Sequence, residues 1–303
     1  MKLVQFQLPT GDIRVGVLQG DEVIDITSEH YHGVTELITA ATELGQDLDT
    51  FLEAYVPAHR GPSYSYDELL NPPHSGQGAL LLPLFPPEVW GCGVTYKRSA
   101  EFRDHDTGQE KGIYDRVYES ERPEIFFKGT ARCCVGHGDA VGVRRDSQVT
   151  ATEPELAYVI NRHGHIVGYT VCNDVSAWDL ERENPLYLPQ SKMYDRCCAL
   201  GPVLATPGSI PDPYNLEITC RIQRDGQYIF EDRVSSSRIG RKFEQLTEFL
   251  LRDNGVPDGT VVSTGTGIMV PNEFALQHGD VVEIEIEGIG LLSNPVQNFG
   301  YKG

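Results

Sequence analysis

Strand-forming segments dominate the chain from residue 124 onward, and their distribution limits the possible folds more than any other feature of the sequence. Runs rich in β-branched and aromatic residues occur at 124–128, 140–144, 155–161, 166–172, 202–206, 216–223, 227–234 and 281–288. One clear helical segment, residues 243–251, interrupts them. A doubly wound α/β fold would alternate strands with helices, so the sequence instead predicts an α+β protein that is mostly β.

The first 88 residues differ from the rest and contain the best candidate for a domain boundary. Residues 2–8 and 13–27 favour strands, whereas apolar residues in 34–55 recur near the helical period. Pro, Gly and Ser are concentrated in 56–88, which is typical of a linker. We therefore predict a small N-terminal β-rich domain at 1–70, a linker at 71–88 and a larger catalytic domain at 89–303.

The charge balance excludes one large class of partners. The chain has 25 Lys and Arg against 44 Asp and Glu, a formal net charge of −19. Nucleic-acid binding needs basic surface, so no nucleic-acid partner is expected. No run of apolar residues is long enough for a membrane-spanning helix, so no membrane partner is expected either.

The cysteines and the N-terminal segment both favour a cytoplasmic protein. The chain has seven cysteines, an odd number, and no Cys-x-x-Cys spacing of the kind that holds structural zinc. The N-terminal residues alternate apolar and polar types and lack the apolar stretch of a secretory signal. We expect reduced, mostly buried thiols.

Three acidic residues form the strongest candidate site. Glu153 and Glu155 are two apart at the start of a predicted strand, so their side chains share one face. If His163-Gly164 is a two-residue hairpin loop, Glu153 lies opposite Asp174 on the return strand. Three carboxylates on one face need a cation or a raised pKa. Oxygen ligands favour Mg²⁺, with Mn²⁺ or Ca²⁺ as alternatives.

A second segment of the chain shows how weak the Glu-x-Glu spacing is alone. Glu283, Glu285 and Glu287 also lie two apart, but regular Val and Ile residues alternate with them. That pattern is typical of a half-buried antiparallel strand with a solvated acidic face. The third carboxylate that the hairpin contributes is what distinguishes the first site.

At these residues the sequence resembles the fumarylacetoacetate hydrolase superfamily. The motifs that carry the resemblance are Glu-Pro-Glu-Leu-Ala at 153–157, Gly-Tyr-Thr-Val-Cys-Asn-Asp-Val-Ser-Ala at 168–177, Ser-Thr-Gly-Thr at 263–266, Gly201-Pro202, Gly288-Ile289-Gly290 and Asn294-Pro295. The resemblance implies a mixed β-sandwich roll over about 89–303 and a metal bound by Glu153, Glu155 and Asp174. It also implies a homodimer or homotetramer.

Further stretches resemble the branch of this superfamily that dehydrates 2-keto-3-deoxy sugar acids. They lie at 86–91, 122–128, 134–138, 183–192 and 197–199. By this resemblance Lys192 is the catalytic lysine and removes a C3 proton from a 2-keto acid. The expected reaction is the metal-dependent dehydration of a 2-keto-3-deoxypentonate to 2,5-dioxopentanoate in oxidative pentose degradation.

Two departures from the superfamily pattern affect the expected chemistry. Its hydrolases carry a His and a Glu, three apart, where this chain has Ser99 and Phe102. Without that pair no group activates water for C–C hydrolysis, which speaks against a hydrolase. The second departure is Trp178, which stands where an Arg that often meets the substrate is usual.

Five further residues are predicted around the substrate. Thr266, in a Gly-flanked loop, is expected to hold the C1 carboxylate, and Thr95 to contact the substrate. Lys128 is a second substrate cation or, equally, part of a surface salt bridge. Tyr187 lines the pocket or simply packs, and Glu183 assists proton transfer or is a solvated loop charge.

Other functions stay open on the sequence alone. An isomerase, a decarboxylase or an acylpyruvate hydrolase of the same superfamily could use the same metal site. A protein that binds a metal or an acid without catalysis is the alternative from another class, against which Lys192 and the intact carboxylates argue.

Overall fold

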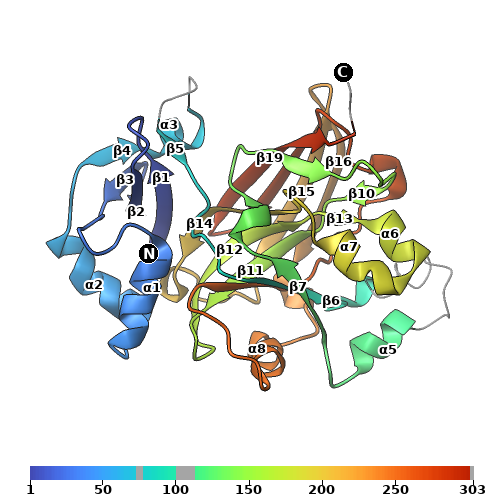
Figure 1. Ribbon diagram of the computed structural model, residues 1–303, viewed down its shortest axis with the longest axis horizontal. Helices are drawn as coiled ribbons and strands as arrows, with labels where there is room; N and C mark the ends of the chain where they lie inside the picture. The colour runs from blue at the N-terminus through green and yellow to red at the C-terminus, as the bar shows by residue number, and fades with distance from the viewer. Residues whose placement is uncertain (73–77, 100–112, 301–303) are drawn as a thin grey trace.

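The computed structural model describes residues 1–72, 78–99 and 113–300. Most of the described strands belong to two sheets, with an N-terminal lobe at one end of the molecule (Figure 1). Along its hydrogen-bonded path the larger sheet contains β4 (Ser63–Ser65), β3 (Glu22–Asp25), β2 (Ile13–Gln19), β1 (Lys2–Gln7), β14 (Cys198–Ala205), β12 (Ile166–Asp174), β11 (Pro154–Ile160), β17 (Thr260–Ser263), β6 (Val89–Gly93) and β7 (Glu124–Gly129). β5 (Ala79–Leu80) pairs with β1, and β8 (Cys134–Val135) pairs with β14.

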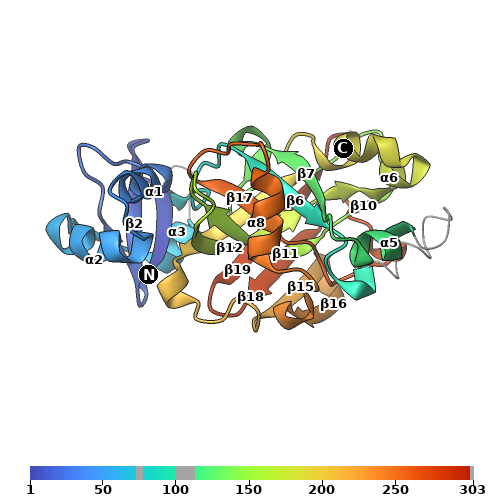
Figure 2. The same cartoon turned by 90° about the horizontal axis from the view of Figure 1, so that it is seen from below.

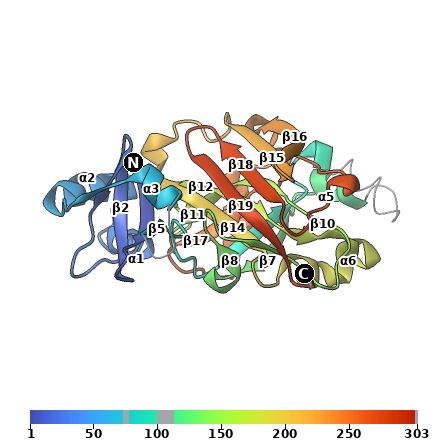
Figure 3. The same ribbon diagram turned by 90° about the horizontal axis from the view of Figure 1, so that it is seen from above.

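The second sheet lies across the larger one (Figure 3). It contains β16 (Gln227–Ser235), β15 (Glu217–Arg224), β18 (Val281–Ile286), β19 (Gly290–Asn298) and β9 (Val141–Val143). A short separate pair joins β10 (Thr150–Ala151) to β13 (Ser176–Ala177). The prediction of a mostly β protein with mixed sheets is confirmed.

Burial along the strands explains their sequences. β11 is buried at every position, which fits its apolar run and its place inside the fold. β18 alternates instead: Val282, Ile284 and Ile286 are buried, whereas Glu285 is exposed. The acidic face of β18 is therefore solvated, as its pattern predicts.

The helices are few and short. They are α1 (Val34–Glu43), α2 (Leu48–Ala58), α3 (Tyr66–Leu70), α5 (Ile113–Glu119), α6 (Trp178–Glu183), α7 (Leu188–Lys192) and α8 (Phe243–Leu251). The predicted helix at 243–251 is confirmed, and it packs against β11 through the stacked rings of Phe243 and Tyr158 (Figure 2). The predicted helical stretch at 34–55 is divided into α1 and α2. Gly45 adopts a positive φ of 67° in the break, and the Asp47 side chain caps α2.

Helical turns of the 3₁₀ type occupy several loops. They are η1 (Ala131–Cys133), η2 (Pro185–Tyr187), η3 (Pro207–Ser209), η4 (Ser236–Arg238) and η5 (Asn272–Phe274). None of the helices in the described ranges is both long and apolar enough to cross a membrane.

The N-terminal lobe is joined to the rest of the molecule by backbone hydrogen bonds as well as by side chains. β1 pairs antiparallel with β14, with Lys2 opposite Ala205 and Leu3 opposite Leu204. One hydrophobic core runs from α1 and α2 through β1 to β11, β12 and β14. The boundary between residues 1–70 and 89–303 stays a prediction.

The β11–β12 hairpin has the predicted register but a different turn. Glu155 lies opposite Cys172, and the Asp174 amide donates to the Glu153 carbonyl over 3.0 Å, so Glu153 and Asp174 are neighbours. The turn uses three residues, Arg162 to Gly164, because the Asn161 amide bonds to the carbonyl of His165. A bulge beside Ile160, which leaves Val167 without a partner on β11, restores the pairing.

Replacing Gly164 by Ala should destabilise this hairpin. Gly164 has φ 80°, and an added Cβ would lie 2.6 Å from Leu251 Cδ1 and 3.1 Å from Thr247 Cγ2. Gly226 is the matched control, because its φ is 77° and nothing lies within 4 Å of an added Cβ. We expect G226A to cost about 1 kcal/mol in urea unfolding and G164A more. Equal losses would contradict a steric role for the α8 contact.

Candidate active site

Three carboxylates converge in the interior, at the open end of the β11–β12 hairpin. Glu153 immediately precedes β11, Glu155 lies within it, and Asp174 ends β12. One oxygen from each lies within 4.8 Å of the others, and all three side chains are buried. The sequence prediction that these residues share one face is confirmed.

Two buried lysines compensate for part of this negative charge. Lys192, the last residue of α7, places Nζ 2.9 Å from Glu153 Oε2 and 3.1 Å from Asp174 Oδ2. Lys128, on β7, places Nζ 2.5 Å from Asp174 Oδ1 and also donates to the Val175 carbonyl. Both lysines are 1% exposed, so the Lys128 pair is not a surface salt bridge.

The two lysines can balance the charge of only two of the three carboxylates. Three carboxylates and two ammonium groups sum to −1 if all are ionised. Burial disfavours the charged form of Lys128, but the neighbouring Asp174 carboxylate and other nearby groups outweigh this effect and hold the pKa of Lys128 well above its usual range. Lys128 is therefore a permanent cation of the site.

Glu155 is the carboxylate whose pKa is raised by burial and by the other two. Burial, and then the charges of Asp174 and Glu153, raise the pKa of Glu155 to about 8. Two donors hold its Oε2: the Ser263 hydroxyl and the Gly265 amide, the latter at 2.8 Å. Without a bound cation, Glu155 is protonated at neutral pH.

The loop after β17 forms one wall of the site. Thr266 is buried there, and its hydroxyl contacts both the carbonyl and the amide of Ile268. The Thr95 hydroxyl donates to the Thr264 carbonyl over 2.6 Å. A Cβ on Gly265 would lie 2.2 Å from Thr95 Oγ1, so the loop and Thr95 pack without room for a side chain at that position. The fold thus packs Thr95 against the loop that contains Thr266.

Two predicted residues lie elsewhere. Glu183, at the end of α6, is exposed, and Tyr187 in η2 is 37% exposed. The structure does not place either against the three carboxylates. Their roles remain predictions. Ser99 is buried, whereas Phe102 lies outside the described residues.

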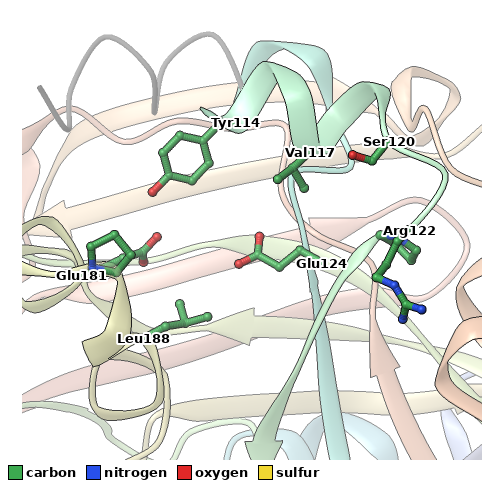
Figure 4. A pocket seen from close by; sticks show the side chains of 9 residues that line it. Tyr114, Val117, Ser120, Arg122, Glu124, Glu181 and Leu188 are labelled. Carbon is green, nitrogen blue, oxygen red and sulfur yellow. The ribbon is translucent and has the colours of Figure 1, made fainter. Parts of the chain in front are cut away.

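A cavity of about 390 Å³ holds residues that the sequence analysis did not select. Its lining residues are Tyr114, Val117, Ser120, Arg122, Pro123, Glu124, Glu181, Pro185 and Leu188 (Figure 4). The carboxylates of Glu124 and Glu181 point toward each other across it. Both are acids placed in a largely apolar cavity.

β7 contributes residues to both the cavity and the carboxylate site: Glu124 lines the first, and Lys128 contacts Asp174 in the second. Glu124 and Phe126 are two apart on this strand and so face one side, and the Phe126 ring lies 5.3 Å from Lys192 Nζ. The neighbouring strand β6 has glycines where these side chains cross it. A Cβ on Gly91 would lie 2.3 Å from Phe126, and one on Gly93 would lie 2.0 Å from Glu124 Oε2. The glycines at 91 and 93 are therefore a sequence signal that side chains of a neighbouring strand, here Phe126 and Glu124, cross β6 at these positions.

One protein family model matches most of the chain, including the carboxylate site. The family model described as fumarylacetoacetate (FAA) hydrolase C-terminal matches residues 89–297. The chain belongs to the fumarylacetoacetate hydrolase family. The resemblance stated from the motifs, and the mixed β-sandwich roll it implied, are confirmed.

Curated relatives and solved structures show the same similarity. The chain is 47% identical over 235 residues to the 2-dehydro-3-deoxy-D-arabinonate dehydratase of Saccharolobus solfataricus, which covers 77% of this chain and 79% of that protein. It is 42% identical to a probable 2-keto-3-deoxyxylonate dehydratase of Haloferax volcanii, over 86% of this chain and 83% of the other. A solved 2-keto-3-deoxy-D-arabinonate dehydratase, complexed with magnesium and 2,5-dioxopentanoate, superposes with a TM-score of 0.83 at 38% identity. It covers 98% of this chain and 99% of its own.

The cluster formed by the three carboxylates is suited to binding a small divalent cation. Its candidate ligand atoms are all oxygens, which Mg²⁺ prefers. Ionisation of Glu155 would give the cluster a net charge of −1, which a bound cation would balance. The residues that would hold it are Glu153, Glu155 and Asp174.

Cation binding should release a proton in a pH-dependent manner. Below pH 8 Glu155 is protonated and must lose its proton to become a ligand, whereas above pH 8 it is already ionised. We expect calorimetric Mg²⁺ titrations in buffers of different ionisation enthalpy to show about one proton released at pH 7 and close to none at pH 9. Apparent affinity should rise with pH and level off near pH 8. No buffer dependence at pH 7 would contradict this account of Glu155.

Proposed function

We propose that this protein is a Mg²⁺-dependent hydro-lyase that dehydrates a 2-keto-3-deoxy sugar acid, converting a 2-keto-3-deoxypentonate to 2,5-dioxopentanoate and water. The observation that carries this proposal is the position of Lys192, whose Nζ contacts two of the three cation-binding carboxylates inside a buried site. The sequence and fold similarity to dehydratases of 2-keto-3-deoxy-D-arabinonate and 2-keto-3-deoxyxylonate supports the same substrate class.

The reaction requires removal of a C3 proton, departure of the C4 hydroxyl, and then loss of a C5 proton with tautomerisation to the aldehyde. Bound Mg²⁺ supplies Lewis-acid stabilisation of the negative charge that develops on the 2-keto oxygen. Lys192 is the proposed base for the C3 proton, because its Nζ lies beside the oxygens of Glu153 and Asp174 that would hold the cation and hence beside the bound 2-keto acid. Thr266, in the loop beside Glu155, is proposed to hold the C1 carboxylate.

The remaining residues are proposed to shape and position the substrate. Lys128 stays charged beside Asp174 and offers a cation to an anionic substrate. Thr95 supports the loop that contains Thr266. Glu183 ends α6 and Tyr187 lies in η2, and both are exposed. From these positions Glu183 would assist proton transfer and Tyr187 would contact the distal end of the substrate.

The presence of Ser, not His, at position 99 favours dehydration over hydrolysis. A hydrolase of this family needs a His at that position to activate water, and the Ser99 hydroxyl is not a base at neutral pH.

Replacing Lys192 by Met tests the proposed base. Met keeps most of the side-chain volume but removes the amine, so kcat should fall by about 10²–10⁴-fold. Mg²⁺ binding should survive, because the three carboxylates remain. Lys242→Met is the matched control, since Lys242 lies over the Tyr214 ring near the start of α8 and should leave turnover unchanged. Near-normal turnover in K192M would refute the assignment.

A substrate panel separates the proposal from its rivals. We expect turnover of a 2-keto-3-deoxypentonate with Mg²⁺, loss of turnover with EDTA, and much slower reaction of oxaloacetate and acylpyruvates. Preference for oxaloacetate would identify a tautomerase or decarboxylase, and preference for an acylpyruvate a hydrolase. If no compound reacts while Mg²⁺ binds, the protein is a non-catalytic binder.

We further propose a cytoplasmic homodimer or homotetramer. All seven cysteines are free thiols and six are buried, which suits a reducing compartment. The oligomer follows from the family resemblance, and light scattering coupled to size-exclusion chromatography should give two or four copies. A monomer at micromolar concentration would contradict this expectation.

A further inference from the structure

Glu153 is held from two sides by different kinds of donor. The Trp178 indole Nε1 donates to Oε1 over 2.7 Å, and Lys192 Nζ donates to Oε2 over 2.9 Å. The lysine is part of the proposed chemistry. The indole is not, because Trp is a donor only, is uncharged and cannot transfer a proton at ordinary pH.

The indole is itself fixed in place. Trp178 begins α6, is buried, and packs with Ala151 and Met269 in a small cluster of its own. The Arg182 guanidinium lies 5.3 Å from its ring centre and is bonded to Asn272 Oδ1 over 2.8 Å. Trp178 therefore presents its N–H to Glu153 from a rigid support.

A fixed N–H on one carboxylate oxygen restricts how that carboxylate can bind a cation. This bond restrains the Glu153 carboxylate and uses part of the acceptor capacity of Oε1, which disfavours chelation of a cation through both oxygens. Mg²⁺ takes six ligands in compact octahedral geometry and is satisfied by single-oxygen contacts, whereas Ca²⁺ takes six to eight and often uses both oxygens of a carboxylate.

We propose that Trp178 is a positioning residue that holds Glu153 as a one-oxygen ligand and so makes the site prefer Mg²⁺ over Ca²⁺. The inference rests on the proposed function for the presence of a divalent cation. Beyond the proposed function, it identifies Trp178 as the residue that determines which cation is preferred. Because hydrogen-bond partners of metal ligands typically contribute 10- to 100-fold to affinity, a change of this size is expected on removing the indole N–H.

The sequence supplies a matched control. The chain has two tryptophans, Trp90 and Trp178. Trp90 Nε1 also donates to a carboxylate, Glu88 Oε2, over 2.8 Å, but Glu88 is not among the three clustered acids. Trp90→Phe and Trp178→Phe thus remove the same kind of bond at two places, one of which touches a proposed cation ligand.

The test is calorimetric titration of the substrate-free protein with Mg²⁺ and, separately, with Ca²⁺. W178F should bind Mg²⁺ about 10- to 100-fold more weakly and Ca²⁺ little changed, so the ratio of the two affinities falls. W90F should keep both affinities. Trp178→His, which retains a ring N–H, should recover part of the Mg²⁺ affinity. An unchanged Mg²⁺ to Ca²⁺ ratio in folded W178F overturns the proposal.

A second readout covers the case in which W178F does not fold. In W90F the single remaining tryptophan is Trp178, so Mg²⁺ binding should change its emission along the calorimetric binding curve. A saturable calorimetric signal without any change in emission would overturn the proposal. Because neither measurement uses a sugar acid, failure of the dehydratase assignment is seen separately, as absence of turnover in a protein that still binds Mg²⁺.

Discussion

Mutual repulsion among three buried carboxylates is the constraint around which this structure is organised. Glu153, Glu155 and Asp174 would not stay ionised together without compensation, and the compensating groups come from distant parts of the chain. β7 provides Lys128, and α7 provides Lys192. The loop after β17 provides the amide of Gly265. The strand order β12-β11-β17-β6-β7 of the larger sheet places β7 and the loop after β17 near the β11–β12 hairpin.

The same repulsion makes the site selective for what it accepts. A neutral ligand does not reduce the repulsion among ionised carboxylates, whereas a small divalent cation does. A 2-keto acid brings its own anionic group, which the permanently charged Lys128 can offset. Family membership and the dehydratase relatives agree with this combination of cation and anionic substrate.

Local spacing in the sequence was enough to predict that the three carboxylates lie together. The features that it did not predict depend on contacts between distant parts of the chain. Alternation along a strand and hairpin pairing both act over a few residues, so Glu153, Glu155 and Asp174 could be grouped from the sequence. The cavity residue on α6 is Glu181, two positions before the predicted Glu183. On a helix two positions are about 200° apart, so the two side chains face in nearly opposite directions. The pairing of β1 with β14 joins residues about 200 apart, and no local pattern predicts it.

The bulge beside Ile160 makes the position of the carboxylates independent of the length of the hairpin loop. A tight two-residue turn and the observed three-residue turn with an extra Val167 give the same pairing between Glu155 and Cys172. The extra residue in the return strand compensates for the longer loop, so the open end of the hairpin is insulated from the length of its closed end. A one-residue change in loop length therefore need not displace Glu155 or Asp174 when the return strand changes by one residue as well.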